Sequence, residues 1–401
     1  MLSFDEARSR LLDEVRALPD ERVDVRDAVD RVLAHDLIAT RPQPPFNYSA
    51  MDGYAVRASD LESSAPDGWP VVGESRTGGE VPAAMAAGTT VRIFTGAMIP
   101  AGADAVVMQE DVDRAGDRVV IRKAVAAGAN IRRAGEDLSA GTVALERGTR
   151  IRPHSIAMLA SLDSARVNVA RRPVVAILST GDELREVGEP DRPGSVIDCN
   201  GPALAALVRQ CGAIPRALPF ARDDLAATEA ALMNALDGAD VVVTVGGVSV
   251  GDHDVVKPAL AAAGIVLDFW KVAIKPGKPI AIGRCGAKYF IGLPGNPASA
   301  LLTFSLFGAP LLRALQGDRS ARPAALPLPL AHDVRHATGR LEFARAALRV
   351  VDGAVTVDVF RNQASGAITT FAWADGFAML PADRSDLREG EVVSFLRMSD
   401  V

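Results

Sequence analysis

Residues 241–254, VVVTVGGVSVGDHD, decide the fold of this 401-residue chain. Five consecutive β-type residues, 241–245, run directly into a glycine-rich turn, and acidic residues follow the turn. A short, continuous apolar run of this kind is typical of a strand buried on both faces of a parallel sheet. Glycines at its end let the backbone approach a ligand, and successive N–H groups there attract an anion. The stretch therefore predicts a strand tip that binds a negatively charged group.

Strands and helices alternate on both sides of this stretch, from residue 174 to residue 316. The predicted strands cover residues 174–178, 214–220, 241–245, 265–272 and 288–291, and the predicted helices cover 202–211, 224–236, 255–263 and 298–315. Alternation of buried strands with helices is the signature of a doubly wound α/β fold. We therefore predict one α/β domain over residues 173–318.

Charged or glycine-rich loops follow three strands of this domain: residues 179–184 (STGDEL), 246–254 and 275–279 (KPGKP). In an open parallel sheet, the loops at the carboxyl ends of the strands line one crevice. Because carboxylates would repel a bare anion, the mixture of lysines and acids favours a phosphorylated ligand held with a divalent cation. A fourth rigid loop, 292–297 (GLPGNP), precedes the last long helix, whose first N–H groups also attract negative charge.

The segments before the α/β domain predict two smaller units. Residues 3–17 have the pattern of an amphipathic helix with a Ser3–Glu6 capping box, and the proline-rich connector 41–46 marks a boundary near residue 42. A second helical pattern covers 153–170. We assign residues 1–41 and 139–172 to a linker domain.

Short β-type runs fill the rest of the chain. Runs at 91–94, 105–108 and 119–122, with a hairpin signal at Gly116-Asp117, predict a small β domain over residues 42–138. After residue 317 the sequence is β-rich again, and Asp352-Gly353 is the strongest hairpin signal in the chain. We assign residues 319–401 to a C-terminal β domain.

Composition narrows the class of protein. The hydrophobic fraction is 48% and the formal net charge is −6, without a long run of one sign, which argues against a nucleic-acid-binding surface. No leader pattern and no uninterrupted apolar run of membrane-spanning length is visible. Cys199, Cys211 and Cys285 are an odd, widely spaced set that fits a reducing compartment. We expect a cytoplasmic protein that binds neither nucleic acid nor membranes.

Residues 247–251 also match G-x-S-x-G, the nucleophile elbow of α/β-hydrolases. An alternative interpretation is therefore a serine hydrolase with Ser249 as its nucleophile. In such an enzyme the serine begins a helix, whereas here the polar residues 252–254 intervene. The catalytic histidine would have to be His332 or His336, which follow the α/β domain.

Seven motifs in chain order resemble the MoeA family of molybdopterin molybdenumtransferases, which is related to the gephyrin E domain. They are residues 47–54 (NYSAMDGY), 94–97 (FTGA), 135–137 (GED), 179–184 (STGDEL), 246–254 (GGVSVGDHD), 275–279 (KPGKP) and 292–297 (GLPGNP). The resemblance implies an elongated homodimer of four-domain subunits: a doubly wound, MogA-like α/β domain, a small β domain, a helical and extended linker domain and a C-terminal β-barrel domain. It also implies an active cleft between the α/β domain of one subunit and the small β domain of its partner.

The resemblance implies an activity as well. Members of the family transfer molybdate onto adenylylated molybdopterin and release AMP in the presence of Mg²⁺. The implied catalytic residues are Asp52, Thr95, Asp137, Glu183, Asp254, Lys275 and Lys278, of which Asp52, Glu183 and Asp254 would bind Mg²⁺. The implied pterin-binding residues are Thr180, Gly181, Asp182, Gly246, Gly247, Ser249, Gly251, Pro294 and Pro297. A molybdopterin adenylyltransferase and downstream molybdoenzymes are candidate partners.

The C-terminal segment matches the family more loosely. Residues 339–345 (GRLEFAR) and 365–370 (SGAITT) resemble family segments, with threonines where serines are common. A non-catalytic scaffold, as in the gephyrin relative, is a further alternative, because fold alone does not fix function. A scaffold would not need acids and lysines in all three crevice loops, and this chain has them.

Overall fold

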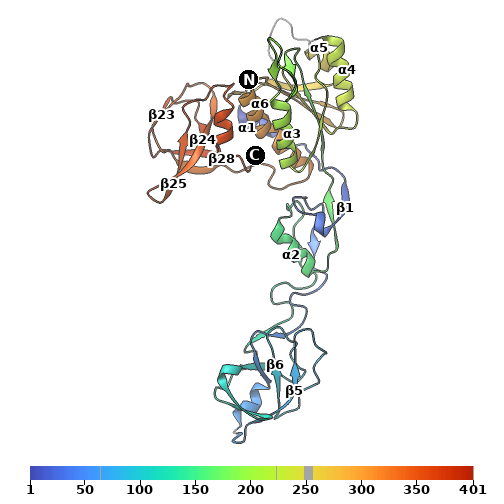
Figure 1. Ribbon diagram of the computed structural model, residues 1–401, viewed down its shortest axis with the longest axis vertical. Coiled ribbons are helices and arrows are strands. Elements are labelled where there is room, and N and C mark those ends of the chain that lie inside the picture. The colour runs from blue at the N-terminus through green and yellow to red at the C-terminus, as the bar shows by residue number, and fades with distance from the viewer. Residues whose placement is uncertain (64, 223, 248–255, 401) are drawn as a thin grey trace.

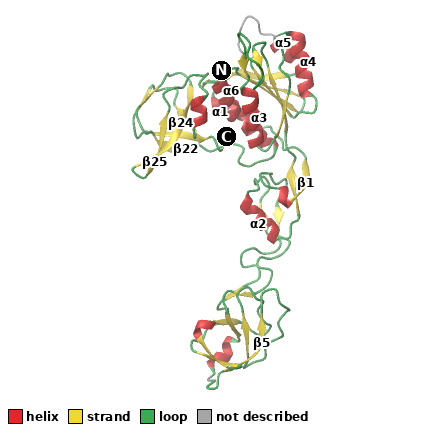
Figure 2. Cartoon of the chain, viewed as in Figure 1, coloured by secondary structure: helices red, strands yellow, loops and turns green. Residues whose placement is uncertain are grey.

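The computed structural model describes residues 1–63, 65–222, 224–247 and 256–400. The chain forms an elongated molecule (Figure 1). The α/β domain and the C-terminal β domain lie side by side at one end, the linker domain follows, and the small β domain occupies the opposite end. The four types of unit expected from the sequence are therefore present, and Figure 2 shows helices gathered around the sheet of the α/β domain, whereas strands prevail in the small β domain at the opposite end.

The α/β domain is built on a six-stranded sheet of order β16-β13-β17-β21-β20-β18. Its strands are β13 (Val174–Ser179), β16 (Ile214–Ala217), β17 (Val241–Val245), β18 (Val266–Lys271), β20 (Pro279–Cys285) and β21 (Lys288–Leu293). Its helices are α3 (Asn200–Gln210), α4 (Leu225–Leu236), α5 (Val256–Ala262), α6 (Pro297–Thr303) and α7 (Ala309–Leu315), with a π-helical turn at Phe304–Gly308 between the last two. The doubly wound fold is confirmed.

Both faces of this sheet are buried, because helices cover each of them. Successive side chains of a strand point to opposite faces and therefore pack into different clusters. Val241, Val243 and Val245 pack into one hydrophobic cluster, whereas Val242 packs into a second cluster on the other face. All five residues of β17 are buried. The prediction that residues 241–245 form a strand buried on both faces is therefore confirmed.

The sequence did not predict β20. It pairs antiparallel with both β18 and β21, so two reversals of direction make β18 parallel to β21. Strands β13, β16, β17 and β21 are mutually parallel. The carboxyl end of β18 therefore lies at the same edge of the sheet as those of β13 and β17. This geometry places the loop 275–279 beside the other two crevice loops.

Helix α1 (Phe4–Leu12) begins at the predicted cap: Ser3 accepts from the Glu6 N–H, and the Glu6 carboxylate accepts from the Ser3 N–H. The helix ends five residues earlier than expected. Its buried face packs with the α/β core, and the Phe4 ring lies 5.8 Å from Phe307 and 5.0 Å from Phe343. This helix therefore belongs physically with the α/β and C-terminal domains, and differs in that respect from our assignment of residues 1–41 to the linker.

The linker domain contains α2 (Pro153–Ser161), β1 (Asp20–Asp24) and β12 (Arg166–Ala170). Our prediction of a helix reaching residue 170 is wrong beyond Ser161, because 166–170 pair antiparallel with β1. Asp163 adopts a left-handed φ of 59° between helix and strand. Short strands β2 (Leu37–Ile38) and β11 (Val143–Leu145) pair nearby, and a 3-10 turn covers Val25–Asp27.

The small β domain is a six-stranded sheet of order β7-β4-β6-β5-β9-β8. Its strands are β4 (Gly53–Val56), β5 (Trp69–Ser75), β6 (Thr90–Ile93), β7 (Ala105–Met108), β8 (Val112–Ala115) and β9 (Arg118–Ile121), with 3-10 turns at Ala58–Glu62 and Gln109–Asp111. The pair β3 (Tyr48–Ser49) and β10 (Ile131–Arg132) lies where the domain joins the linker. The predicted hairpin is confirmed, because β8 and β9 pair across Gly116, whose φ is 63°.

The C-terminal domain is a closed β-barrel. Strands β22 (Leu326–Pro329), β24 (Leu341–Val351), β25 (Ala354–Val359), β26 (Gly376–Leu380) and β28 (Val392–Arg397) pair in the path β25-β24-β26-β28-β22. A bridge between Leu330 and Val357 joins the two ends of this path. The predicted hairpin at Asp352-Gly353 is confirmed. Smaller elements are β23 (Val334–Arg335), β27 (Asp386–Leu387) and α8 (Thr369–Trp373).

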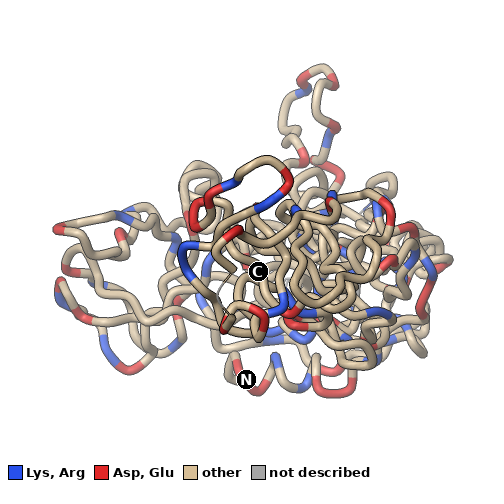
Figure 3. The backbone as a smooth tube through the Cα atoms, turned by 90° about the horizontal axis from the view of Figure 1, so that it is seen from below, with Lys and Arg blue, Asp and Glu red and all other residues tan. Residues whose placement is uncertain are grey.

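One helical segment of the described chain, Pro297–Leu315, is long and apolar enough to cross a membrane. Because 83% of its most apolar window is buried inside the protein, it has the character of a core helix. Lys and Arg are interspersed with Asp and Glu along the backbone (Figure 3). That the protein binds no nucleic acid remains a prediction.

Candidate functional site

A cleft of about 500 Å³ lies at the carboxyl edge of the α/β sheet. Glu183 comes from the first predicted loop, Gly246 and Gly247 from the second, Pro279 from the third and Gly295 from the fourth. The full lining is Glu183, Leu184, Val196, Ile197, Asp198, Cys199, Asn200, Gly246, Gly247, Pro279, Pro294, Gly295, Asn296 and Pro297. The four loops therefore converge, as the strand order requires.

The first two loops touch each other where Gly246 approaches Thr180. Gly246 has a φ of 90°, and a Cβ atom there would lie 2.9 Å from the Thr180 carbonyl oxygen, so only glycine fits this approach. The Gly246 N–H donates to the Leu293 carbonyl (3.1 Å). Its amide is thus used within the sheet, and the amides that a ligand could meet begin at Gly247. Ser249, Gly251 and Asp254 lie outside the described residues.

Glu183 is the exposed carboxylate that the first loop presents to the cleft. Its side chain lies over Gly181, whose φ is 143°, and a Cβ atom on Gly181 would lie 2.5 Å from a Glu183 carboxylate oxygen. The short strands β14 (Leu184–Arg185) and β15 (Val196–Ile197) pair immediately after it, which fixes the backbone of the loop. Asp182 is exposed and does not line the cleft.

The two lysines of the third loop differ in their surroundings. The Lys275 ammonium donates to Glu342 in the C-terminal barrel, with Nζ 3.0 Å from Oε2. Lys278 is exposed, and among the described residues it has no side-chain partner. Gly277 between them has a φ of 95° and packs so closely on Thr303 that a Cβ atom would lie 2.3 Å from its methyl group. Lys278 is therefore the lysine more free to bind a ligand.

The sequence analysis missed several residues that shape the cleft. Asp198 is 8% exposed; its carboxylate accepts from the N–H groups of Asn200 and Gly201 (3.0 Å each) and from the Ser179 hydroxyl (3.0 Å). The Asn200 amide donates to the Gly295 carbonyl at 2.9 Å. An Asp two residues before the first turn of a helix is a recognisable capping signal, and that pattern could have identified Asp198.

Replacing Asp198 by Ala should destabilise the protein by about 1–3 kcal/mol, because two N–H groups at the start of α3 and the Ser179 hydroxyl lose a buried acceptor. Urea unfolding measures the change. The matched control is Asp191→Ala, an 84% exposed carboxylate in the same loop, which should cost less than about 0.5 kcal/mol. Equal effects of the two substitutions would contradict this role of Asp198.

The small β domain holds a second polar group, between β3 and β4 and after β6. The Asp52 carboxylate accepts from both the N–H and the hydroxyl of Thr95, each at 2.7 Å. The hydrogen bond from the backbone N–H of Thr95, followed by that from its hydroxyl, lowers the pKa of Asp52, so its carboxylate is ionised at neutral pH. Asp137 belongs to the same domain and is exposed. Within one chain, the small β domain that contains Asp52 and Thr95 lies at the opposite end of the molecule from the α/β domain (Figure 1).

The proposed metal ligands are therefore not brought together by a single chain. Glu183 lies at the cleft, Asp52 lies in the small β domain, and Asp254 is outside the described residues. In the part of the chain that the structure describes, no three His, Cys, Asp or Glu side chains are grouped as a metal site would require. One subunit supplies at most part of a Mg²⁺ site from its described residues.

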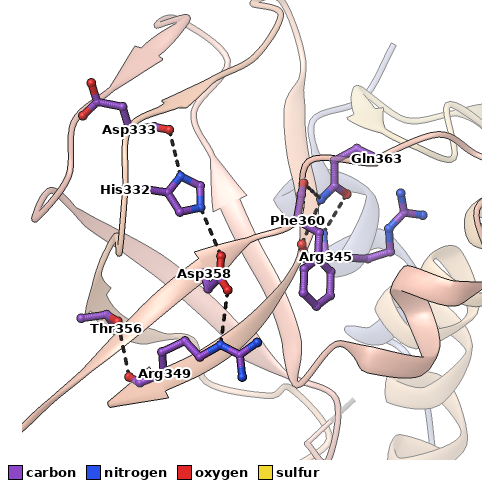
Figure 4. Close-up of polar contacts among 8 residues, drawn as sticks. All are labelled: His332, Asp333, Arg345, Arg349, Thr356, Asp358, Phe360 and Gln363. Carbon is purple, nitrogen blue, oxygen red and sulfur yellow. Dashed lines mark hydrogen bonds and ion pairs between the residues drawn. The ribbon is translucent and has the colours of Figure 1, made fainter. Parts of the chain in front are cut away.

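The histidines of the hydrolase alternative belong to the barrel. His332 contacts Asp358, with Nε2 3.2 Å from Oδ1, and the Arg349 guanidinium contacts the same carboxylate (Figure 4). Neither His332 nor His336 lines the cleft. Cys199 does, but burial raises the pKa of its thiol, which disfavours the nucleophilic thiolate.

Three family models match most of the chain. Residues 2–162 match the MoeA N-terminal region (domain I and II), residues 176–314 match a probable molybdopterin binding domain, and residues 327–398 match the MoeA C-terminal region (domain IV). Fold, cleft and matches together define a multidomain protein whose α/β unit is of the molybdopterin-binding class.

Similar proteins narrow this class. The chain is 39% identical to a molybdopterin molybdenumtransferase of Haemophilus influenzae and 36% identical to molybdopterin molybdenumtransferase 2 of Mycobacterium tuberculosis; the first alignment covers 98% of both chains, and the second covers 97% of this chain and 98% of the relative. A crystal structure of the molybdopterin biosynthesis MoeA protein of Pyrococcus horikoshii matches with a TM-score of 0.85 at 30% identity, over 99% of this chain and 100% of that one. The chain belongs to the MoeA family of molybdopterin molybdenumtransferases and is an enzyme.

Proposed function

We propose that this enzyme transfers molybdate onto adenylylated molybdopterin and releases AMP. The observation that carries the proposal is the convergence of four strand-tip loops on one cleft in a chain of the MoeA family. Neither a hydrolase nor a scaffold gains support from the relatives.

The residues of the cleft suit a phosphorylated pterin. Backbone from Gly247 onward would bind the phosphate groups together with the exposed Lys278, which precedes the lining residue Pro279. The rigid loop at Pro294 and Pro297 would form one wall of the pterin site. Thr180 is committed to the sheet, since its N–H donates to the Val245 carbonyl at 3.0 Å. Its role is to shape the loop. Electrostatic positioning carries the reaction, without a covalent protein intermediate.

Glu183 is the described carboxylate best placed to bind Mg²⁺ at the cleft. Asp254 of the same subunit and, in addition, Asp52 of the partner subunit would complete the set of oxygen ligands that this cation prefers. When bound, Mg²⁺ neutralises phosphoanhydride oxygens and stabilises the charge that develops on the leaving AMP. Ser249 and Gly251 would extend the anion-binding backbone from the same loop.

The separation of the two polar groups within one chain supports a homodimer. Asp52, Thr95 and Asp137 can meet Glu183 only if the small β domain of a second subunit reaches the cleft, as the elongated shape permits (Figure 1). A molybdopterin adenylyltransferase would supply the substrate, and molybdoenzymes would receive the product. The cytoplasm is the compartment in which these exchanges would occur.

The decisive assay uses the purified full chain with adenylylated molybdopterin, Mg²⁺ and molybdate. We expect AMP release that depends on molybdate and a pterin product that activates an apo-molybdoenzyme. Molybdate-independent esterase turnover that is abolished by Ser249→Ala would refute the proposal in favour of a hydrolase.

Lys278→Ala should raise the dissociation constant of adenylylated molybdopterin about tenfold, because a charge-assisted contact to phosphate is worth about 1.5–3 kcal/mol before screening by solvent. Calorimetric titration measures it. Lys271→Ala, which removes a half-buried lysine at the end of β18 that does not line the cleft, should leave the constant unchanged. An unchanged constant for Lys278→Ala would remove this lysine from the phosphate site.

A further inference from the structure

A buried carboxylate lies directly behind the third cleft loop. Glu342 of β24 is 3% exposed, and its Oε2 atom lies 3.0 Å from Lys275 Nζ and 3.6 Å from His336 Nδ1. The side chain of His336 is also 3% exposed, and its ring nitrogens make no hydrogen bond to any described residue. One oxygen of Glu342 thus faces a lysine of the third loop on one side and a barrel histidine on the other.

Backbone pairing holds this group together. Strand β19 (Ile274–Lys275) adds to the edge of the barrel, parallel to β24, with Lys275 in register with Glu342. The Arg340 guanidinium donates to the Ile274 carbonyl at 3.2 Å. The strand pairing fixes both backbones opposite each other, so less side-chain entropy is lost when the ion pair forms.

Charge balance explains why the pair should persist. A carboxylate with so little exposure needs a counter-charge, and removal of one partner from a buried pair is costly. Other charged side chains of this part of the barrel are paired elsewhere: Asp333 with Arg388, Arg335 with Asp386 and His332 with Asp358. The buried Arg345 also attracts Glu342 through its charge, but the Lys275 ammonium is the cation that donates a hydrogen bond to this carboxylate, and the Lys275 side chain is 36% exposed.

We propose that Glu342 is a positioning residue, which holds the Lys275 ammonium at the active cleft and makes the C-terminal barrel part of the catalytic apparatus. The inference rests on the proposed function, since it takes Lys275 as a residue that contacts the phosphorylated substrate. His336 fills the inner side of the carboxylate and prevents it from turning away from Lys275.

The test is a double-mutant cycle in the full chain with Lys275→Ala, Glu342→Gln and both together, assayed by molybdate-dependent AMP release. If Glu342 acts through Lys275, Glu342→Gln lowers kcat/KM at least about tenfold, and the double variant is no worse than Lys275→Ala. Asp358→Asn, which removes a barrel carboxylate paired with the other histidine, is the matched control and should retain wild-type kcat/KM.

The possible outcomes distinguish a failure of the proposed function from a failure of the role proposed for Glu342. If Lys275→Ala leaves the activity intact, the role of Lys275 in the proposed function fails. If Lys275→Ala is impaired but Glu342→Gln is not, or if the two losses multiply, the inference fails and the proposed function stands.

A measurement on the unaltered chain guards against variants that do not fold. Lys275 should react with a small acylating reagent more slowly than Lys278, as read by mass spectrometry, because its ammonium is paired. In a folded Glu342→Gln variant the Lys275 rate should rise toward that of Lys278. Equal rates in the wild-type chain would overturn the proposal.

Discussion

Glu183→Gln should lower the rate of molybdate-dependent AMP release by about 10²-fold or more, the scale typical of losing one stabilising group of a transition state. The Gln side chain keeps the size of Glu183 and its place over Gly181 but removes the charge that would bind Mg²⁺. Affinity for adenylylated molybdopterin should stay within about threefold of the wild type, since the backbone amides and Lys278 remain. Single-turnover kinetics and calorimetry give the two quantities.

The control for this prediction is Glu186→Gln, an exposed carboxylate of the same connection that does not line the cleft. It should leave both quantities unchanged. A Glu183→Gln variant with wild-type turnover, or one whose loss of affinity equals its loss of rate, would show that this carboxylate does not act on the transition state.

The second large effect concerns the origin of Asp52 in each active site. Asp52→Asn removes a carboxylate that two hydrogen bonds from Thr95 keep ionised, and it should inactivate the enzyme to a similar extent as Glu183→Gln. If each cleft combines Glu183 of one subunit with Asp52 of the partner subunit, a mixed dimer of these two variants has one intact site. Random mixing should then restore about one quarter of the wild-type activity, since half of the dimers are mixed and each has one of two sites.

Co-expression of the two variants with different tags allows the mixed dimer to be purified, and this species should have about half of the wild-type activity, because one of its two sites is intact. Each variant mixed with itself should remain inactive. A mixed species without activity, or a wild-type chain that is monomeric and fully active at assay concentrations, would contradict a site shared between subunits.

The core of the α/β domain could be predicted because local and global preferences agree there. In β17, β-branched residues fill every position and both faces are covered, so period and propensity gave the same answer. The gathering of the loops followed from parallel strand order alone. In contrast, the run 166–170 reads as the end of a helix until its antiparallel partner, β1, is known.

Long-range pairing explains the other differences. β20 follows directly on a proline-rich loop, and only its antiparallel neighbours make it a strand. The ion pair of Lys275 with Glu342 joins residues 67 positions apart, and no local pattern signals it. Nor could spacing reveal that one chain keeps Asp52 far from Glu183, because the length of the linker domain sets that separation.

The most direct test of the central claim is a crystal structure of the protein with adenylylated molybdopterin and Mg²⁺. We expect the phosphates to lie within hydrogen-bond distance of the loop that begins at Gly246 and of Lys278, with Glu183 at the cation and the small β domain of a partner subunit over the cleft. A ligand bound away from the carboxyl edge of the α/β sheet would contradict the account.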